Sequence, residues 1–228
     1  LEPWKHIPPV ALLEVYLGTA SVDVKGARSR SRGGENDAMR AKEFDVVAIG
    51  NAIVDVIARA NDGFLAAQGI DKGVMTLIDE ARATALYAAM GPAIESSGGS
   101  AANTIAGLAN LGAATGYIGV VAQDDLGAIF RHDITALGVH FPTAPVAAGP
   151  ATARCLIVVT PDAQRSMNTF LGACADISVA HLDPKLLAAA KVVYLEGYLW
   201  DRPTAKVAFL EACRLTHAAG GKIALSLS

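Results

Sequence analysis

The sequence is poor in cysteine and in charged residues, and it contains no long hydrophobic run. Its cysteines, Cys155, Cys174 and Cys213, lie far apart and do not have the spacing of metal ligands. A sparse and odd set of this kind fits a reducing compartment and a fold without disulfides, so we expect a cytoplasmic protein. No apolar run reaches the roughly 18 residues that a membrane-spanning helix needs. We therefore expect no membrane partner.

The charge balance gives no electrostatic reason to expect a nucleic acid partner. Lys and Arg number 19 and Asp and Glu number 22, which leaves a formal net charge of −3. Charged residues make up only 18% of the chain and hydrophobic residues 52%, a composition that excludes a disordered protein. A chain of 228 residues is long enough for one large domain, or for one domain with a small appendage.

Several familiar catalytic motifs are missing. The sequence has no G-x-x-x-x-G-K-[ST] phosphate loop, no G-x-G-x-x-G dinucleotide fingerprint and no G-x-S-x-G nucleophile elbow. Its five histidines show no two-histidine metal-ligand spacing. These absences argue against the nucleotide, hydrolase and metal sites that such motifs build.

The first forty residues differ from the remainder of the chain. They hold three prolines and the polar, basic run Gly26–Gly34, and they show no apolar periodicity. We expect residues 1–40 to be disordered or to be a non-native extension, with the folded domain over 41–228. An Arg-Ser run is also compatible with RNA binding or targeting, and RNA retention that is lost on deletion of residues 1–38 would support that alternative.

The remainder of the sequence alternates between expected strands and helices. Short apolar runs predict strands, and apolar residues at helical spacing between aspartate caps and glycines predict helices. The expected strands are 45–49, 117–121, 191–195 and 223–227, with a hairpin of 152–159 and 165–170; the expected helices are 80–90, one after Gly98-Gly99, one from Asp124 to Gly138, one from Asp183-Pro184 and 203–218. This alternation predicts an α/β fold with a mostly parallel sheet flanked by helices.

Ser228 comes at the carboxyl end of an expected strand, with no helix after it. Ligands of open α/β sheets bind at these carboxyl ends. We therefore expect that the carboxyl-terminal part of the fold is missing here, and with it half of the site.

The segment Ser96–Asn103 is the most informative stretch for function. Gly98 and Gly99 come directly before an expected helix, where they would let the backbone approach a ligand closely. The free amides of a helix start favour an oxygen-rich ligand, and Asn103 offers donors and acceptors suited to sugar hydroxyls. The structural alternative is a plain turn with Ser100 as the helix cap.

Three further residues are candidates. Asn51 and Asp55 follow the first expected strand, and in an extended segment they share a face with residue 53. A carboxylate at a strand end can accept from two neighbouring hydroxyls; the alternative is a turn residue and a surface aspartate. Arg165, after the expected hairpin turn, could approach a phosphate, or it could be a solvated charge. Helix capping explains Asp124 better than catalysis does.

Together these residues resemble the amino-terminal two thirds of a PfkB/ribokinase-type kinase, closest to the adenosine kinase branch. The resemblance runs from about Phe44 to Ser228. It rests on five motifs in order: Gly50-Asn51-x-x-x-Asp55, Gly98-Gly99-x-x-x-Asn103, the Leu111-Gly112 to Gly127 segment, Gln164-Arg165-Ser166 and Val193–Tyr198. The implied fold is ribokinase-like, with a small β lid formed near 51–57, 74–78 and 152–170.

The resemblance also implies roles for single residues. Asn51 and Asp55 would bind the nucleoside or sugar, and Gly98, Gly99 and Asn103 would hold the ribose hydroxyls. Arg165 would lie near the transferred phosphate. The implied reaction is the phosphorylation of adenosine to AMP, or of an equivalent sugar hydroxyl, with ATP and Mg²⁺.

The family's Gly-Ala-Gly-Asp and Asn-x-x-Glu motifs do not occur in this sequence. The first would supply the anion hole and the catalytic base, and the second would help to bind magnesium and phosphate. No catalytic residue is therefore assigned here, and we expect this chain alone to bind substrate weakly without turnover, the intact parent being the kinase. The alternative is a non-catalytic module that binds a nucleoside or sugar. Neither the choice between nucleoside and sugar nor the oligomeric state follows from the residues.

Overall fold

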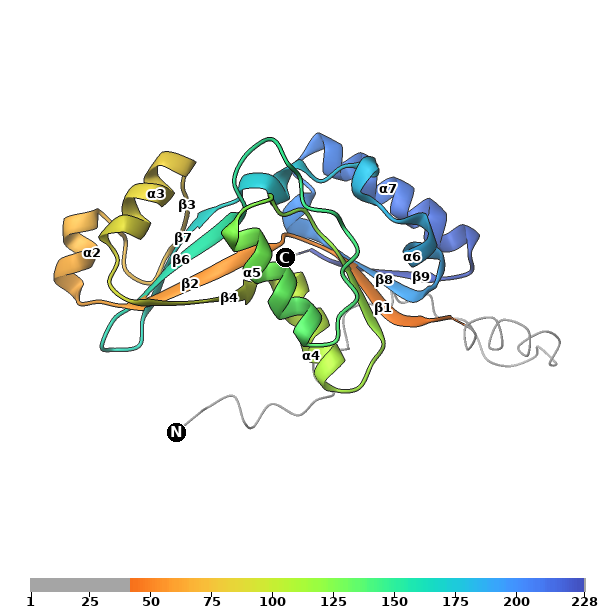
Figure 1. The fold of residues 1–228 in the computed structure, drawn as a ribbon, viewed down its shortest axis with the longest axis horizontal. Helices are drawn as coiled ribbons and strands as arrows, with labels where there is room; N and C mark the ends of the chain where they lie inside the picture. Colours follow the sequence, from red (N-terminus) through yellow and green to blue (C-terminus); the bar gives the residue numbers. More distant parts are fainter. Residues whose placement is uncertain (1–41, 228) are drawn as a thin grey trace, which may run out of the picture.

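The computed structural model describes residues 42–227. The expectation for residues 1–40 lies outside this range. The described chain forms two lobes around two β-sheets, with the helices α4 and α5 between them (Figure 1). None of the helices in the described part is long and apolar enough to cross a membrane.

A parallel four-stranded sheet forms one lobe. Its strands, in spatial order, are β5 (Thr115–Ile118), β1 (Phe44–Ile49), β8 (Ala190–Glu196) and β9 (Lys222–Ser226). Successive side chains of a strand point to opposite faces, so Val47 and Ile49 enter one core while Ala48 enters another. The apolar strands β1, β5 and β8 are those of a sheet buried on both faces, whereas the edge strand β9 is mostly exposed.

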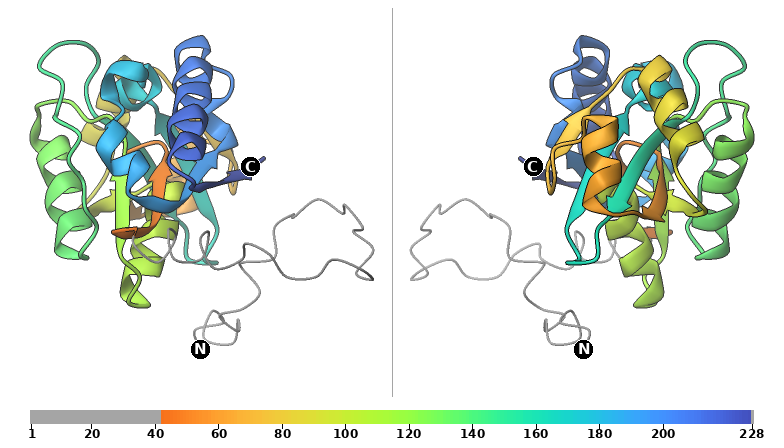
Figure 2. Two further views of the ribbon diagram at one scale, coloured as in Figure 1. Left: turned by 90° about the vertical axis from the view of Figure 1, so that its right-hand side faces the viewer. Right: turned by 90° about the vertical axis from the view of Figure 1, so that its left-hand side faces the viewer.

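Helices cover both faces of this sheet. Helix α4 (Ser100–Asn110) packs on one face; α6 (Pro184–Ala188) and α7 (Pro203–Ala218) pack on the other (Figures 1 and 2). Pro203 at the first helical position starts α7, because its missing N–H would have no partner there. The predicted bounds of this helix, 203–218, are confirmed.

A mixed five-stranded sheet forms the second lobe. Its strands, in spatial order, are β3 (Met75–Leu77), β7 (Arg165–Phe170), β6 (Ala153–Val159), β2 (Ile53–Arg59) and β4 (Ala93–Gly98). Its segments include those that the family resemblance assigned to a lid. One face is buried under α2 (Asp62–Gln68), α3 (Glu80–Ala89) and α5 (Asp125–Ala136). On the opposite face Met75, Leu77 and Ile94 are exposed.

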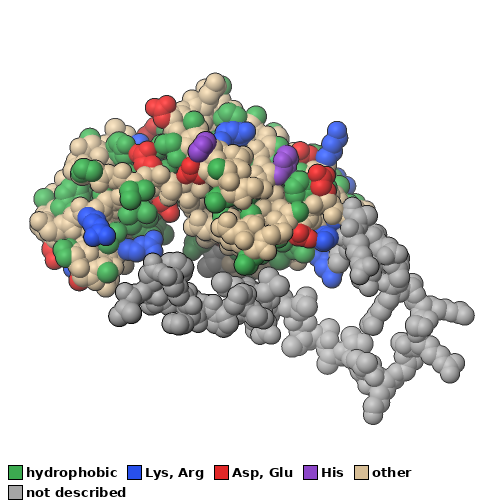
Figure 3. All heavy atoms as spheres, turned by 60° about the horizontal axis from the view of Figure 1, so that its bottom comes forward, with side chains coloured by type: hydrophobic (Ala, Val, Ile, Leu, Met, Phe, Trp, Pro, Cys, Tyr) green, Lys and Arg blue, Asp and Glu red, His purple; other side chains and the backbone are tan. Residues whose placement is uncertain are grey.

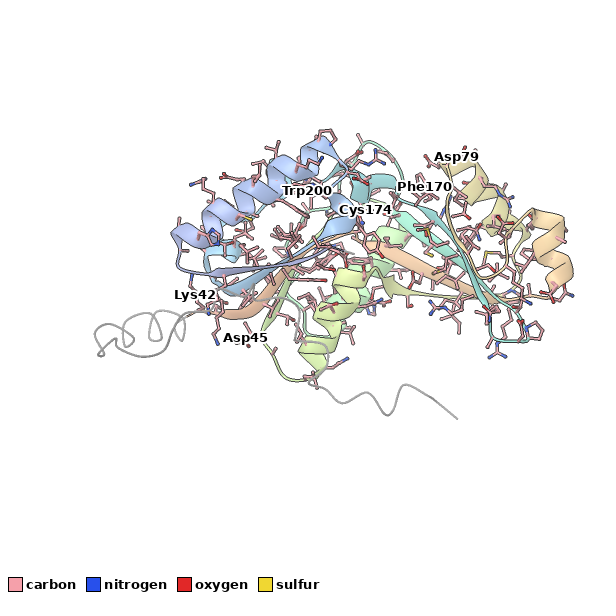
Figure 4. The ribbon with its side chains drawn as sticks, turned by 180° about the vertical axis from the view of Figure 1, so that it is seen from behind. Lys42, Asp45, Asp79, Phe170, Cys174 and Trp200 are labelled. Atoms are coloured by element: carbon pink, nitrogen blue, oxygen red, sulfur yellow. The ribbon has the colours of Figure 1, made fainter. Side chains whose placement is uncertain are left out.

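Polar side chains close the helix ends. Asp124 caps α5 and accepts from the Gly127 amide at 2.8 Å, as the sequence predicted. Lys42 binds the carboxyl ends of two helices, because its Nζ donates to Ala188 O at 2.5 Å and to Ala219 O at 2.6 Å. Lys42 and Asp45 lie together at the far end of the parallel sheet (Figure 4).

Three short 3₁₀ segments complete the described chain: η2 (Gly172–Asp176), η3 (Val179–His181) and η4 (Gly197–Leu199).

The structure corrects the sequence-based assignment in four places. The strand expected at 117–121 lies at Thr115–Ile118, since the chain leaves the sheet at Gly119. Helix α2 and strand β4 were not predicted. Ser100 is not the cap of α4: Gly99 occupies that position, and Ser100 is the first helical residue.

Candidate functional site

Asp55 and Gly98 lie against each other on neighbouring strands. Antiparallel pairing of β2 with β4 places Ile53 opposite Gly98 and Asp55 opposite Ser96. A methyl group added to Gly98 would lie 2.4 Å from both Cγ and Oδ2 of Asp55. The carboxylate therefore occupies the space that any other side chain at position 98 would fill.

Gly99 brings the start of α4 against the backbone of Asn51, in the segment that follows β1. Its φ is +90°, a conformation that favours glycine, and a methyl group there would lie 2.4 Å from the backbone oxygen of Asn51. Because Gly99 has no side chain, α4 begins without the usual side-chain cap. The glycine pair thus brings together Asn51, Asp55 and the first turn of α4.

The two candidate asparagines differ in burial. Asn51 is 7% exposed, and its Oδ1 accepts from the Cys174 thiol at 3.1 Å. Cys174 lies near the middle of the molecule, where the two sheets meet (Figure 4). Asn103 is exposed in the first turn of α4, and its backbone N–H donates to Gly99 O at 2.8 Å. Its side-chain amide makes no hydrogen bond within residues 42–227, so it is free to meet a ligand.

The carboxyl group of Asp55 is partly desolvated. Burial raises its pKa above the ordinary value of 3.8, and the positive charge of Arg165 lowers it in part. Arg165 is exposed at the start of β7, two strands from β2. Cys155, directly opposite Asp55 on β6, shares this environment, and burial raises the pKa of its thiol to about 11. An inert thiol and a desolvated carboxylate therefore face the same side of the sheet.

A pocket of about 350 Å³ lies at the end of β3 and β7 rather than at these residues. Its apolar lining comes from Leu77, Phe170 and Leu171, and its charged lining includes Asp176 and Arg202. Leu77 and Thr169 stand in the same register row as Cys155 and Asp55. Asp79 also lines the pocket and lies close to Phe170 at this edge of the sheet (Figure 4). In space-filling view the molecule is hollowed between the two lobes (Figure 3).

The sequence analysis missed one charged residue at the site. Glu196 ends β8, is 2% exposed, and accepts hydrogen bonds from the Ser100 hydroxyl and the Ala101 amide. Burial raises its pKa, and these two bonds lower it in part. A carboxylate that ends an otherwise apolar strand was the signal that could have found it.

The pfkB family carbohydrate kinase model matches residues 93–227, more than half of the chain. The chain belongs to this family. A comparison with curated protein sequences finds no match. The expected family and the expected ribokinase-like α/β fold are both confirmed. Kinases of this family use ATP.

Solved structures support the same family. An adenosine kinase from Sinorhizobium meliloti is 55% identical with a TM-score of 0.75, and a probable sugar kinase from Rhizobium etli CFN 42 is 53% identical with a TM-score of 0.75. Each match covers 82% of this chain and 57% of the other. The adenosine kinase of Schistosoma mansoni, 22% identical with a TM-score of 0.70 over 82% of this chain and 55% of its own, shares the fold. The chain therefore spans less than two thirds of the length of its relatives.

The described residues do not fit a magnesium site of their own. Within 42–227 no three His, Cys, Asp or Glu side chains gather in a way that could hold a metal ion. The acidic groups of the site, Asp55 and Glu196, instead meet a strand and the start of a helix. We derive no step through Mg²⁺ from these residues.

Proposed function

We propose that this chain forms the nucleoside-binding part of a kinase that transfers a phosphoryl group from ATP to a nucleoside hydroxyl, with adenosine as substrate and AMP as product. The observation that carries the proposal is the carboxylate of Asp55, partly desolvated and packed against Gly98 beside the start of α4, whose N-cap residue is a glycine. A buried carboxylate costs stability unless it gains partners. The two hydroxyls of a ribose are partners that fit this place.

Each neighbouring group suits a ribose. A carboxylate only accepts hydrogen bonds, and it can accept from two adjacent hydroxyls at once. Asn103 adds an amide that can donate and accept, and it comes from the first turn of a helix whose partial positive charge favours oxygen atoms. Gly98 and Gly99 leave the backbone open to close approach. A ribose bound here would contact the five-stranded sheet and the first turn of α4.

The choice of adenosine rests on two supports. The relative from Sinorhizobium meliloti is described as an adenosine kinase. The pocket lined by Leu77, Phe170 and Leu171 also provides apolar surface on the same lobe as Asp55. Such a surface suits a planar base better than it suits a sugar.

Arg165 is proposed to face the phosphate. Its charge already reaches Asp55 without an ion pair between them, and no hydrogen bond fixes its guanidinium within the described residues. An arginine of this kind suits an incoming phosphoryl group. ATP and Mg²⁺ belong to the proposal for the intact protein, and we propose that this chain alone binds nucleoside without turning it over.

Isothermal titration of the 228-residue chain with adenosine and with ribose tests the proposal. We expect adenosine to bind more tightly than ribose, and we expect Asp55→Asn to weaken binding by at least about ten-fold, the effect of losing charge-assisted hydrogen bonds. Asp125→Asn is the matched control, because Asp125 is exposed in the first turn of α5. Equal binding by the wild-type chain and Asp55→Asn would refute the assigned site.

A turnover assay with labelled ATP separates the remaining alternatives. No AMP should form with the chain alone, whereas the intact parent should form AMP from adenosine. A parent that binds adenosine without forming AMP would instead favour the non-catalytic module. Formation of AMP by the chain alone would contradict the proposed division of labour.

A further inference from the structure

A cluster of polar side chains, all buried except the exposed Ser100, lies beneath the glycine pair. We call it the floor cluster; its members are Asn51, Ser100, Tyr117, Cys174 and Glu196. They come from separate parts of the chain. Tyr117 is fully buried and Glu196 is 2% exposed, so both have left water almost completely. The proposed function does not use Glu196 or Tyr117.

Glu196 replaces the helix cap that Gly99 cannot supply. The first amides of any helix lack partners within the helix, and a side chain at the N-cap position normally accepts from one of them. Here the acceptor comes from the neighbouring sheet instead: the carboxylate at the end of β8 accepts from the Ala101 amide and the Ser100 hydroxyl. A negative charge at this end also interacts favourably with the helix dipole.

The geometry around Gly50 keeps this contact tight. A methyl group on Gly50 would lie 2.4 Å from Cβ of Ala101, 3.2 Å from the Tyr117 hydroxyl and 3.5 Å from Oε2 of Glu196. Neither the Tyr117 hydroxyl nor Oε2 of Glu196 has a hydrogen-bond partner within the described residues. Two buried polar atoms thus face one small space beside the start of α4.

A carboxylate at this position lowers stability relative to an apolar residue. An apolar side chain would continue the strand and fill the core without losing hydration. What the carboxylate provides is a fixed acceptor at the helix start that carries the candidate ribose ligands. The destabilising group therefore lies at the site, where it has a structural use.

We propose that Glu196 is a positioning residue of the nucleoside site: it caps α4 from β8 and thereby holds Gly98, Gly99 and Asn103 against Asn51 and Asp55. This inference rests on the proposed function, because the positioned groups are those assigned to the ribose. Glu196 itself does not touch the nucleoside.

The test compares Glu196→Ala with Glu196→Gln in the full chain. Glutamine keeps one acceptor oxygen for the Ala101 amide, so we expect its adenosine affinity to stay within about three-fold of the wild type. Alanine leaves that amide without an acceptor, and we expect at least about ten-fold weaker binding. Glu211→Ala is the control, because Glu211 pairs with Arg214 on the surface of α7.

Hydrogen exchange without ligand gives the second readout. We expect the amides of residues 101–103 to exchange faster in Glu196→Ala than in wild type, and glutamine to restore their protection. Should Glu196→Ala fail to fold, Ser100→Ala removes one of the two bonds to the same carboxylate and should give a smaller change of the same kind.

The outcomes separate the two claims. A wild-type chain that binds no adenosine would refute the proposed function, while exchange at 101–103 would still test the cap. Unchanged adenosine affinity in Glu196→Ala would overturn the positioning role even if the wild type binds. A Glu196→Gln chain that binds as poorly as Glu196→Ala, with α4 still protected, would also overturn it.

Discussion

The carboxylate of Asp55 occupies the place where a side chain at position 98 would stand, 2.4 Å from the position of a Cβ on Gly98. The two residues lie far apart in the sequence and come together because β2 and β4 pair in one register. Asp55 therefore keeps its orientation only while residue 98 is glycine.

Gly98→Ala should separate binding from stability. The added methyl group meets the end of a side chain that can rotate, so we expect the free energy of unfolding to change by only about 1 kcal/mol. The displaced Asp55 should weaken adenosine binding by about ten-fold or more. Calorimetric titration and urea denaturation measure the two effects.

Gly107→Ala is the control for that experiment. Gly107 lies in the interior of α4, and a methyl group there meets nothing within 4 Å. Alanine should stabilise the helix by about 0.5–1 kcal/mol and leave adenosine affinity unchanged. If both alanine variants bound adenosine like the wild type, the orientation of Asp55 would not matter for binding.

Asp55→Asn should stabilise the chain near neutral pH while it weakens binding. Burial raises the pKa of Asp55 in the folded chain above 3.8, with Arg165 opposing in part. Folding therefore favours the protonated form, and stability from this group is present below pH 3.8 and lost as the pH rises through the folded pKa. The stability gained by Asp55→Asn in urea denaturation should be visible at pH 7 and should shrink below about pH 4. A variant less stable than wild type at neutral pH would contradict this.

Arg165→Ala should move the pH dependence of adenosine binding upward. Without the positive charge, the pKa of Asp55 rises further, so affinity should fall at a higher pH as the solution is acidified. Arg165 is exposed, and the shift should be smaller in high salt because the charge is screened. Arg59→Ala, which removes an exposed arginine from the same register row, should leave the pH profile unchanged.

Asp124→Ala should be the most damaging cap variant. Asp124 accepts from the Gly127 amide at 2.8 Å, the Thr152 amide at 2.8 Å and the Thr152 hydroxyl at 2.6 Å. We expect its loss to cost about 2–3 kcal/mol in urea denaturation, against about 1 kcal/mol for Asp79→Ala, whose cap bond is to the Arg82 amide.

The pH dependence of that variant has the opposite sign to that of Asp55. Burial raises the pKa of Asp124, but the hydrogen bonds from Thr152 and Gly127 outweigh it, and the pKa lies below 3.8. Its stabilising effect is therefore present above pH 3.8 and lost as the pH falls through the folded pKa. Wild type and Asp124→Ala should converge in stability in strong acid; a gap that persists there would argue against the carboxylate as the source.

Capping residues, prolines and glycines in the sequence were sufficient to predict a helix where they mark both of its ends. Pro203 and the glycines after residue 219 delimit α7, and Asp124 marks the start of α5, so both helices were predicted well. Helix α2 was missed although Asn61 caps it and Gly69 ends it in a left-handed conformation, because its 7 residues give too short an apolar pattern.

The contacts between distant segments could not be predicted from local patterns. Strand β4 has the sequence AIESSG, which shows no strand periodicity; its conformation comes from pairing with β2. The seat of Asp55 on Gly98 follows from that pairing, and the cap of α4 by Glu196 follows from the packing of α4 on the parallel sheet. Motifs in the sequence supplied the candidate residues, but not the contacts that these residues make.

The core beneath the site joins the two sheets. Ala48 and Tyr117 of the parallel sheet pack in one cluster with Val54 and Leu156 of the five-stranded sheet and with Phe130 of α5. Since neither sheet can expose its share of this cluster without exposing that of the other, the two lobes should melt together as one cooperative unit. A nucleoside bound to the five-stranded sheet and to α4, which packs on the parallel sheet, would then protect the whole of residues 42–227 against transient opening, and not the site alone.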